Sequence, residues 1–193
     1  LFNFKRLYPD ILFPGKTQFE ESKRFSNTPS DRLIDIVNPI SWIKTAQKVI
    51  KYNPDIIIIQ FWMPFFAPAL RIITSKLKRK LKSAKVIILC HNIVPHEGSP
   101  TDKILTQYFF KKADGFIVQS KSVVEDLKQL IPNAKYKYNP HPIYDVFGTP
   151  MKATEAKTKL SSNNEDKIIL FFGYIRKYKG VKYLIKAMPK VLE

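Results

Sequence analysis

Two patterns of apolar residues alternate along most of the chain, and this alternation limits the possible folds more than any other feature. From residue 41 onward, short runs of β-branched and aromatic residues are followed by stretches in which apolar residues recur at helical spacing. Strands and helices that alternate in this way form βαβ crossovers and a parallel sheet. The sequence therefore predicts an α/β protein with a parallel sheet flanked by helices.

The expected elements follow one another closely. Strands are expected at 55–61, 85–91, 115–119, near Tyr136 and at 167–172, and helices at 41–52, 66–81, 99–112, from 120 to about 130, and from 180 onward. The strand at 55–61 has an unbroken apolar centre, so we expect it to be covered on both faces. Ser41 is expected to cap the first helix, and Ser122 and Glu125 have the spacing of a capping box.

Prolines and polar residues divide the chain into regions. Pro140 and Pro142 restrict the backbone around His141 and mark a candidate hinge. We expect one domain over residues 1–145, a polar connector over 146–166 and the start of a second domain over 167–193. A single strand and helix cannot bury their own apolar surfaces, so most of that second domain is expected to lie outside this sequence. The opening residues likewise suggest a cut rather than a true start.

The charge of the chain indicates what kinds of partner it attracts. Lys and Arg number 33 against 16 Asp and Glu, which gives a formal net charge of +17. Such a surface draws nucleic acid, anionic lipid or phosphorylated substrates. The run 71–85 has seven basic residues and no acid, and is either a solvated helix face or a peripheral contact with an anionic membrane. Exposed aromatics do not interleave with it, so no specific nucleic acid is expected.

Metal and thiol chemistry are not expected. Cys90 is the single cysteine, which excludes an intrachain disulfide and any C-x-x-C pair. Cys90, His91, His96 and Glu97 crowd one strand end, but a fourth ligand at zinc spacing is missing, and a strand directs Cys90 and His91 to opposite faces. Within an apolar strand the thiol is expected to be inert. The most apolar stretch, 56–70, is short and interrupted by prolines, so no transmembrane helix is expected.

His91 is the candidate catalytic residue. It lies at the carboxyl end of an expected parallel strand, which is the edge where open α/β sheets bind ligands. The loop that follows, with Asn92, His96 and Glu97, could shape a binding surface above it. A partly buried structural histidine is the alternative reading.

The turn between the last strand and helix has the chemistry of a diphosphate site. Gly173 allows close approach to the backbone, and Gly180 opens a helix with free N–H groups and a positive dipole end. Arg176 and Lys179 add two cations. The alternative reading is a solvated basic turn.

Several segments in this order resemble one known family. They are the strand end His91-Asn92 with Pro95-His96-Glu97, the hinge Pro140-His141-Pro142-Ile143-Tyr144, the stretch from Ile169 to Gly180, and the opening residues Tyr8-Pro9 and Phe13-Pro14-Gly15-Lys16-Thr17. Together they resemble a family 4 glycosyltransferase with the GT-B fold. The most specific part is F-G-x-I-R-x-Y-K-G at 172–180. The resemblance implies a Rossmann-like first domain lacking its first strand, and the first strand and helix of a second Rossmann-like domain.

The resemblance also implies the activity. Such enzymes transfer a sugar from a nucleotide-diphosphate donor, here a UDP- or GDP-sugar, to a glycan or lipid-linked acceptor with retention and without a required metal or other cofactor. His91 then lies near the transferred sugar and orients it, while Arg176 and Lys179 hold the diphosphate. The chain alone is expected to be inactive, and the full protein to act in glycan or polysaccharide biosynthesis.

Two other classes of function stay open on the sequence alone. A basic α/β module could bind membrane or nucleic acid without catalysis, and a GT-B-fold nucleotide-sugar epimerase would share the fold. The expected location is the cytoplasm, with peripheral contact at the inner face of the cell membrane.

Overall fold

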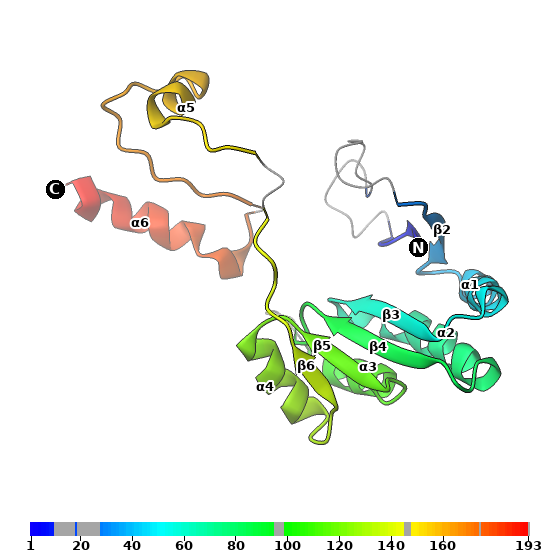
Figure 1. Ribbon diagram of the computed structural model, residues 1–193. Helices are drawn as coiled ribbons and strands as arrows, with labels where there is room; N and C mark the ends of the chain where they lie inside the picture. The colour runs from blue at the N-terminus through cyan, green and yellow to red at the C-terminus, as the bar shows by residue number, and fades with distance from the viewer. Residues whose placement is uncertain (10–17, 19–27, 95–98, 145–147, 174, 193) are drawn as a thin grey trace. The chain divides into compact units, whose positions relative to one another are not determined.

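The computed structural model describes residues 1–9, 18, 28–94, 99–144, 148–173 and 175–192 (Figure 1). The chain divides into two units, Leu1–His141 and Pro142–Glu193. Each unit is described by itself.

A four-stranded parallel sheet organises the first unit. Its strands are β3 (Ile56–Phe61), β4 (Lys85–Cys90), β5 (Gly115–Val118) and β6 (Tyr136–Tyr138), which lie side by side in chain order. The register aligns Phe61 with Cys90, Cys90 with Val118, and Val118 with Tyr138. All four carboxyl ends therefore meet at one edge, and the predicted parallel α/β fold is confirmed.

The helices between these strands cover one face of the sheet. They are α2 (Ala67–Lys80), which follows a short 3₁₀ turn, η2 (Pro64–Phe66), then α3 (Pro100–Phe110) and α4 (Lys121–Leu130). Right-handed crossovers that advance in one direction place successive helices on the same face, and Figure 1 shows α2 and α3 behind the sheet. The buried core between them includes Phe61, whose ring centroid lies 5.7 Å from that of Phe109 and 5.0 Å from that of Phe110.

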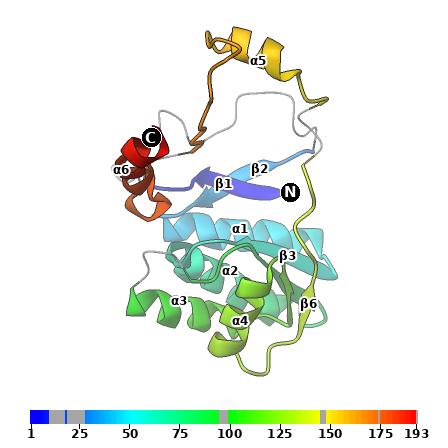
Figure 2. The same ribbon diagram turned by 90° about the vertical axis from the view of Figure 1, so that its left-hand side faces the viewer.

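A second, two-stranded parallel sheet precedes this one. It consists of β1 (Phe2–Arg6) and β2 (Asp31–Asp35), neither of which was predicted. Helix α1 (Pro39–Tyr52) lies between this sheet and α2 (Figure 2). Arg6 donates two hydrogen bonds to Asp35, Nε to Oδ1 at 2.9 Å and an Nη to Oδ2 at 2.6 Å. These bonds hold the pKa of Asp35 below its usual value.

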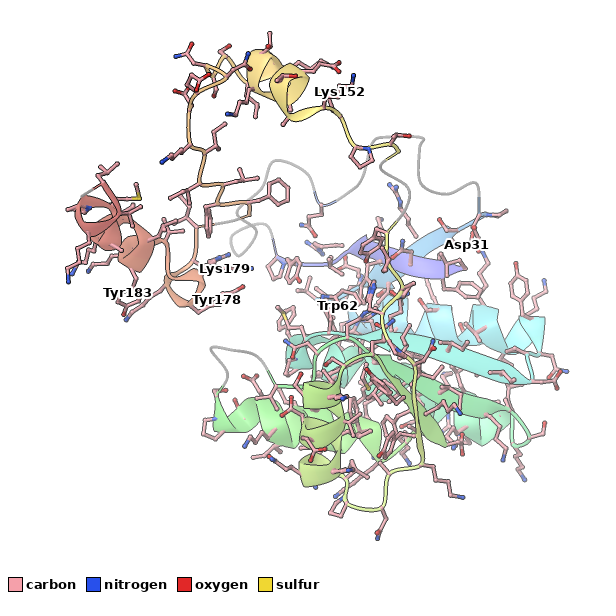
Figure 3. The ribbon with its side chains drawn as sticks, turned by 60° about the vertical axis from the view of Figure 1, so that its left-hand side comes forward. Asp31, Trp62, Lys152, Tyr178, Lys179 and Tyr183 are labelled. Atoms are coloured by element: carbon pink, nitrogen blue, oxygen red, sulfur yellow. The ribbon has the colours of Figure 1, made fainter. Side chains whose placement is uncertain are left out.

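Aromatic side chains connect the two sheets of this unit. Phe4 of β1 lies with its ring centroid 6.1 Å from that of Trp62 and 5.2 Å from that of Phe66. Trp62, labelled in Figure 3, follows β3 directly, and its ring lies 4.8 Å from that of the fully buried Phe66. The carboxyl end of β3 is thus closed by packed rings.

Two predicted helix caps were wrong. The side chain of Asn38, not Ser41, accepts a hydrogen bond from the Ile40 N–H at 3.0 Å and caps α1, because that helix begins earlier than its apolar stripe. Ser120, not Ser122, caps α4 by accepting from the Val123 N–H at 3.2 Å. Both true caps have extended backbone, which a side-chain cap requires.

The expectation that the strand at 55–61 is covered on both faces was also wrong. Ile56 and Ile58 of β3 are exposed, while Ile57 and Ile59 pack against the core. The physical reason is the common face of the crossover helices, since no helix in the described part of the chain covers the opposite face of β3.

The second unit contains helices and no strand within its described residues. Its elements are α5 (Ala153–Lys159), the 3₁₀ turn η3 (Lys177–Lys179) and α6 (Val181–Leu192). The strand predicted at 167–172 was wrong, because no described segment pairs with it. None of the described residues of this unit is buried. Across the described parts of both units, no helix combines the length and apolar character needed to span a bilayer.

Candidate functional site

His91 lies where the sequence predicted, at the carboxyl edge of the four-stranded sheet. It follows Cys90, the last residue of β4, and its backbone N–H donates to the Phe61 carbonyl of β3 at 2.9 Å. This bond extends the ladder by one step and fixes where the side chain emerges. His91 and Asn92 are both half-buried. His96 and Glu97 lie outside the described residues.

A second histidine, His141, lies close to His91 in the structure. The ring centroids of His91 and His141 are 6.3 Å apart, with an angle of 52° between the ring planes. Burial lowers the pKa of His91, and the neighbouring His141 lowers it further. Both effects favour the uncharged imidazole, which offers one donor nitrogen and one acceptor nitrogen.

The path of the chain after β6 explains this pairing. The Asn139 N–H donates to the Val118 carbonyl at 2.9 Å, and the His141 N–H donates to the Gln119 carbonyl at 3.3 Å. The segment thus continues along β5 past the end of both strands. His141 reaches the same edge as His91 although β5 separates their strands.

Gln119 is the third polar residue at this edge. It follows Val118, the last residue of β5, and its side-chain Oε1 is buried without a hydrogen-bond partner. Gln119 was not among the residues predicted for the site, and His141 was expected only as part of a hinge. The signal that selected His91 was available for Gln119 too, since it directly follows a parallel strand.

Cys90 is fully buried at the end of β4. Burial raises the pKa of the Cys90 thiol to about 12, which keeps it protonated. Within the described ranges, no three His, Cys, Asp or Glu side chains gather as a metal site requires.

Gly173 and Gly180, in the turn of the second unit, both have a positive φ angle. Gly173 has φ of 126° and Gly180 has φ of 75°, both in the region that disfavours other residues. Between them, the Lys179 N–H donates to the Arg176 carbonyl at 3.0 Å, which closes the 3₁₀ turn. The Lys179 ammonium lies 5.5 Å from the centroid of the Tyr178 ring, and both residues belong to η3, just before α6 (Figure 3).

The start of α6 differs in one detail from the prediction. The Gly180 N–H is not free, because it donates to the Lys177 carbonyl at 3.2 Å. The next two N–H groups, of Val181 and Lys182, have no acceptor among the described residues. These two groups, rather than that of Gly180, present the positive end of the helix dipole.

The predicted site residues thus fall into two groups. His91 and Asn92 belong to the first unit, while Gly173, Arg176, Lys179 and Gly180 belong to the second. That the two groups converge on one ligand stays a prediction.

Comparison with known proteins identifies the class. The model of Glycosyltransferase Family 4 matches residues 11–144, more than half of the chain. The match includes His91, Gln119 and His141. No curated protein matches the chain. On the family match, this chain belongs to glycosyltransferase family 4.

Proposed function

We propose that the protein transfers a sugar from a UDP- or GDP-sugar to a glycan or lipid-linked acceptor, with retention at the anomeric carbon. The family match carries the proposal, because it supports a glycosyltransferase type of activity. The uncharged His91 at the ligand-binding edge of a parallel sheet agrees with it. We assign transfer to the full-length protein, because none of the described residues of the second unit is buried.

Each proposed residue has a distinct part in the reaction. As the glycosidic bond to the donor breaks, negative charge builds on the leaving diphosphate. Arg176, Lys179 and the exposed N–H groups at the start of α6 stabilise that charge more than they stabilise the ground state. His91, as a neutral hydrogen-bonding group, orients the transferred sugar and does not attack it.

Turnover of the full-length protein on a panel of UDP- and GDP-sugars tests the proposal. We expect His91→Ala to lower kcat/KM by about 100-fold or more, because the transferred sugar is no longer oriented. We expect Arg176→Ala to lower it by about 10- to 100-fold, because a charge-assisted bond to the diphosphate is lost. Lys186→Ala, an exposed lysine of α6, is the control and should leave turnover unchanged. Circular dichroism checks that each variant folds. Unchanged turnover of His91→Ala would refute its role.

Product analysis separates the alternatives. Sugar on an acceptor with the donor's anomeric configuration, read by NMR, supports retaining transfer. An altered sugar nucleotide formed without any acceptor supports an epimerase instead. Salt-dependent retention on DNA that Arg176→Ala barely changes, with no turnover, supports a non-catalytic binding module.

The basic run 71–85 supports a second proposal, contact with an anionic membrane. Two of its cations serve the fold: the Arg71 guanidinium lies 4.1 Å from the Tyr108 ring centroid, and Lys78 pairs with Asp114 at 2.6 Å. The remaining five form no ion pair with a described carboxylate: Lys76, Arg79, Lys80, Lys82 and Lys85. Most of these five lie at the end of α2 and the start of β4, so we propose that the amino edge of the sheet meets the lipid.

Vesicle binding tests this surface. The protein should bind to phosphatidylcholine vesicles that contain phosphatidylglycerol. The double substitution Arg79→Glu with Lys82→Glu should weaken this binding by roughly 1 kcal/mol or more per residue. Lys103→Glu with Lys121→Glu changes the charge equally on exposed residues near the opposite edge, and should have a smaller effect. Equal losses in both variants would show that net charge alone attracts the protein.

A further inference from the structure

Three polar residues that follow separate strands lie at the carboxyl edge of the sheet. His91 follows β4, Gln119 follows β5 and His141 lies beyond β6. The His141 N–H bond to the Gln119 carbonyl at 3.3 Å and the 6.3 Å between the histidine rings tie the three together. The function proposed above uses only His91.

The side chain of Gln119 carries an unpaired polar atom at this edge. A buried polar atom without a partner costs about 1–3 kcal/mol, and native structures rarely keep one without a reason. Oε1 of Gln119 is such an atom, and it lies on the residue next to the ligand-binding edge of β5. A ligand group that pairs with it would remove this cost.

The chemistry of the three groups selects the kind of ligand. The oxygens of an ionised diphosphate only accept hydrogen bonds, so they cannot satisfy an amide oxygen. A hydroxyl group both donates and accepts, and therefore pairs with an amide and with either nitrogen of a neutral imidazole. Burial and His141 keep His91 in that neutral form. Hydroxyl groups, as a sugar carries them, fit this edge best.

We propose that Gln119 and His141 bind hydroxyl groups of the transferred sugar beside His91. They hold the sugar, while the cations of the second unit hold the diphosphate. This inference rests on the proposed function and extends it by dividing the donor between two sets of residues. The division predicts that changes at Gln119 or His141 affect sugar and nucleotide binding differently.

Calorimetric binding to the full-length protein tests that difference. Two pairs of probes are used: UDP-glucose with UDP, and GDP-mannose with GDP. For the pair that the wild type binds, the dissociation constants of the nucleotide sugar and of the nucleoside diphosphate are compared. We expect His141→Ala and Gln119→Leu each to weaken binding of the nucleotide sugar by about tenfold, because a sugar contact is lost. Binding of the nucleoside diphosphate, which lacks the sugar, should weaken by less than about twofold. His141→Gln, which keeps a hydrogen-bonding side chain, should recover most of the affinity.

Two further variants complete the comparison. Arg176→Ala should weaken the binding of nucleotide sugar and of nucleoside diphosphate to the same extent. Lys137 is an exposed residue of β6, and Lys137→Ala should weaken the binding of neither ligand. If His141→Ala and Gln119→Leu fold and bind the nucleotide sugar as the wild type does, the inference is wrong while the proposed function stands. Equal weakening of both ligands would also overturn it. A wild type that binds no nucleotide sugar would overturn both.

Discussion

Two segments of this chain have nearly the same sequence pattern and different structures. Lys85–Cys90 reads K-V-I-I-L-C and Lys167–Phe172 reads K-I-I-L-F-F. The first is the paired strand β4, in which Val86, Ile88 and Cys90 are each 0% exposed. The second forms no strand, and Ile168, Leu170 and Phe172 are 49%, 79% and 91% exposed.

The difference between the segments lies in their neighbours. β4 has β3 on one side and β5 on the other, so its backbone groups are paired, and Ile88 and Cys90 share one buried core with residues of α2 and α3. The 167–172 segment has no such partner in the described part of the second unit. A run of β-branched and aromatic residues therefore supplies a strand's side chains, while the strand itself requires a partner strand and a covering layer.

Thiol reactivity gives the largest expected contrast between the two segments. Cys90 and Phe172 occupy the same place in the shared pattern, so Phe172→Cys puts a second thiol at the matching position. Since burial raises the pKa of Cys90 to about 12, its thiolate is scarce. At mildly alkaline pH the new exposed thiol should react with iodoacetamide about 1,000-fold faster or more.

Mass spectrometry of the alkylated chain over time measures both rates in one molecule. The wild-type chain is the control and should stay unmodified until denaturant is added. Equal rates at the two positions would mean that β4 is not buried or that 167–172 is covered.

Truncating one aromatic side chain in each unit gives the next contrast. Phe61→Ala removes a fully buried ring of β3 and should lower the free energy of unfolding by about 3–5 kcal/mol. Phe172→Ala removes an exposed ring and should change it by less than about 0.5 kcal/mol. Trp42 and Trp62, the two tryptophans of the chain, both lie in the first unit, so urea unfolding followed by fluorescence reports on it.

A comparable loss in the two variants would contradict the assignment of 167–172 to an unpacked region. It would mean that Phe172 packs against the unit that the tryptophans report.

An ion pair in each unit gives the smallest contrast. Asp114 accepts from Lys78 of α2 at 2.6 Å and from the Val86 N–H of β4 at 2.8 Å. Burial alone would raise the pKa of Asp114, but these hydrogen bonds and the charges of Lys78 and Lys85 bring it below the usual value. Asp114→Asn should therefore cost about 1–3 kcal/mol near neutral pH.

The sign of the pH dependence follows from that lowered pKa. The stabilisation by Asp114 is present above pH 3.8, the ordinary value, and is lost as pH falls through the lower folded-state pKa. The difference in the free energy of unfolding between wild type and Asp114→Asn should therefore shrink to about zero over that pH range. Glu155→Gln breaks the exposed pair with Lys159 on α5, and should cost about 0.5 kcal/mol or less at any pH. If the difference in the free energy of unfolding between wild type and Asp114→Asn does not change with pH, the charge of Asp114 does not stabilise the fold.

Much of the first unit could be predicted from the sequence. The four strands of the larger sheet and the helices between them follow from apolar periodicity, and His91 follows from its place after a strand. The strands β1 and β2 could not be found in this way, because each is short and mixes charged with apolar residues. The caps Asn38 and Ser120 were missed because several polar residues near each helix start could serve equally well.

The candidate site was predicted less completely than the fold. Spacing identified His91, Arg176 and Lys179 as chemically suited residues. It could not show that His141 lies beside His91, since that depends on the backbone following β5 after β6 ends. The unpaired Oε1 of Gln119 was equally hidden, because burial and pairing are properties of the folded chain.

The sequence by itself determined which segments could be strands or helices, where the cations lie along the chain, and the family to which it belongs. These depend on residue type and spacing along the chain, which need no partner. Only the tertiary structure decided that K-V-I-I-L-C is a buried strand and K-I-I-L-F-F is not, and that two histidines 50 residues apart in the sequence share one edge. Pairing and burial are contacts between distant segments, and no local pattern specifies them.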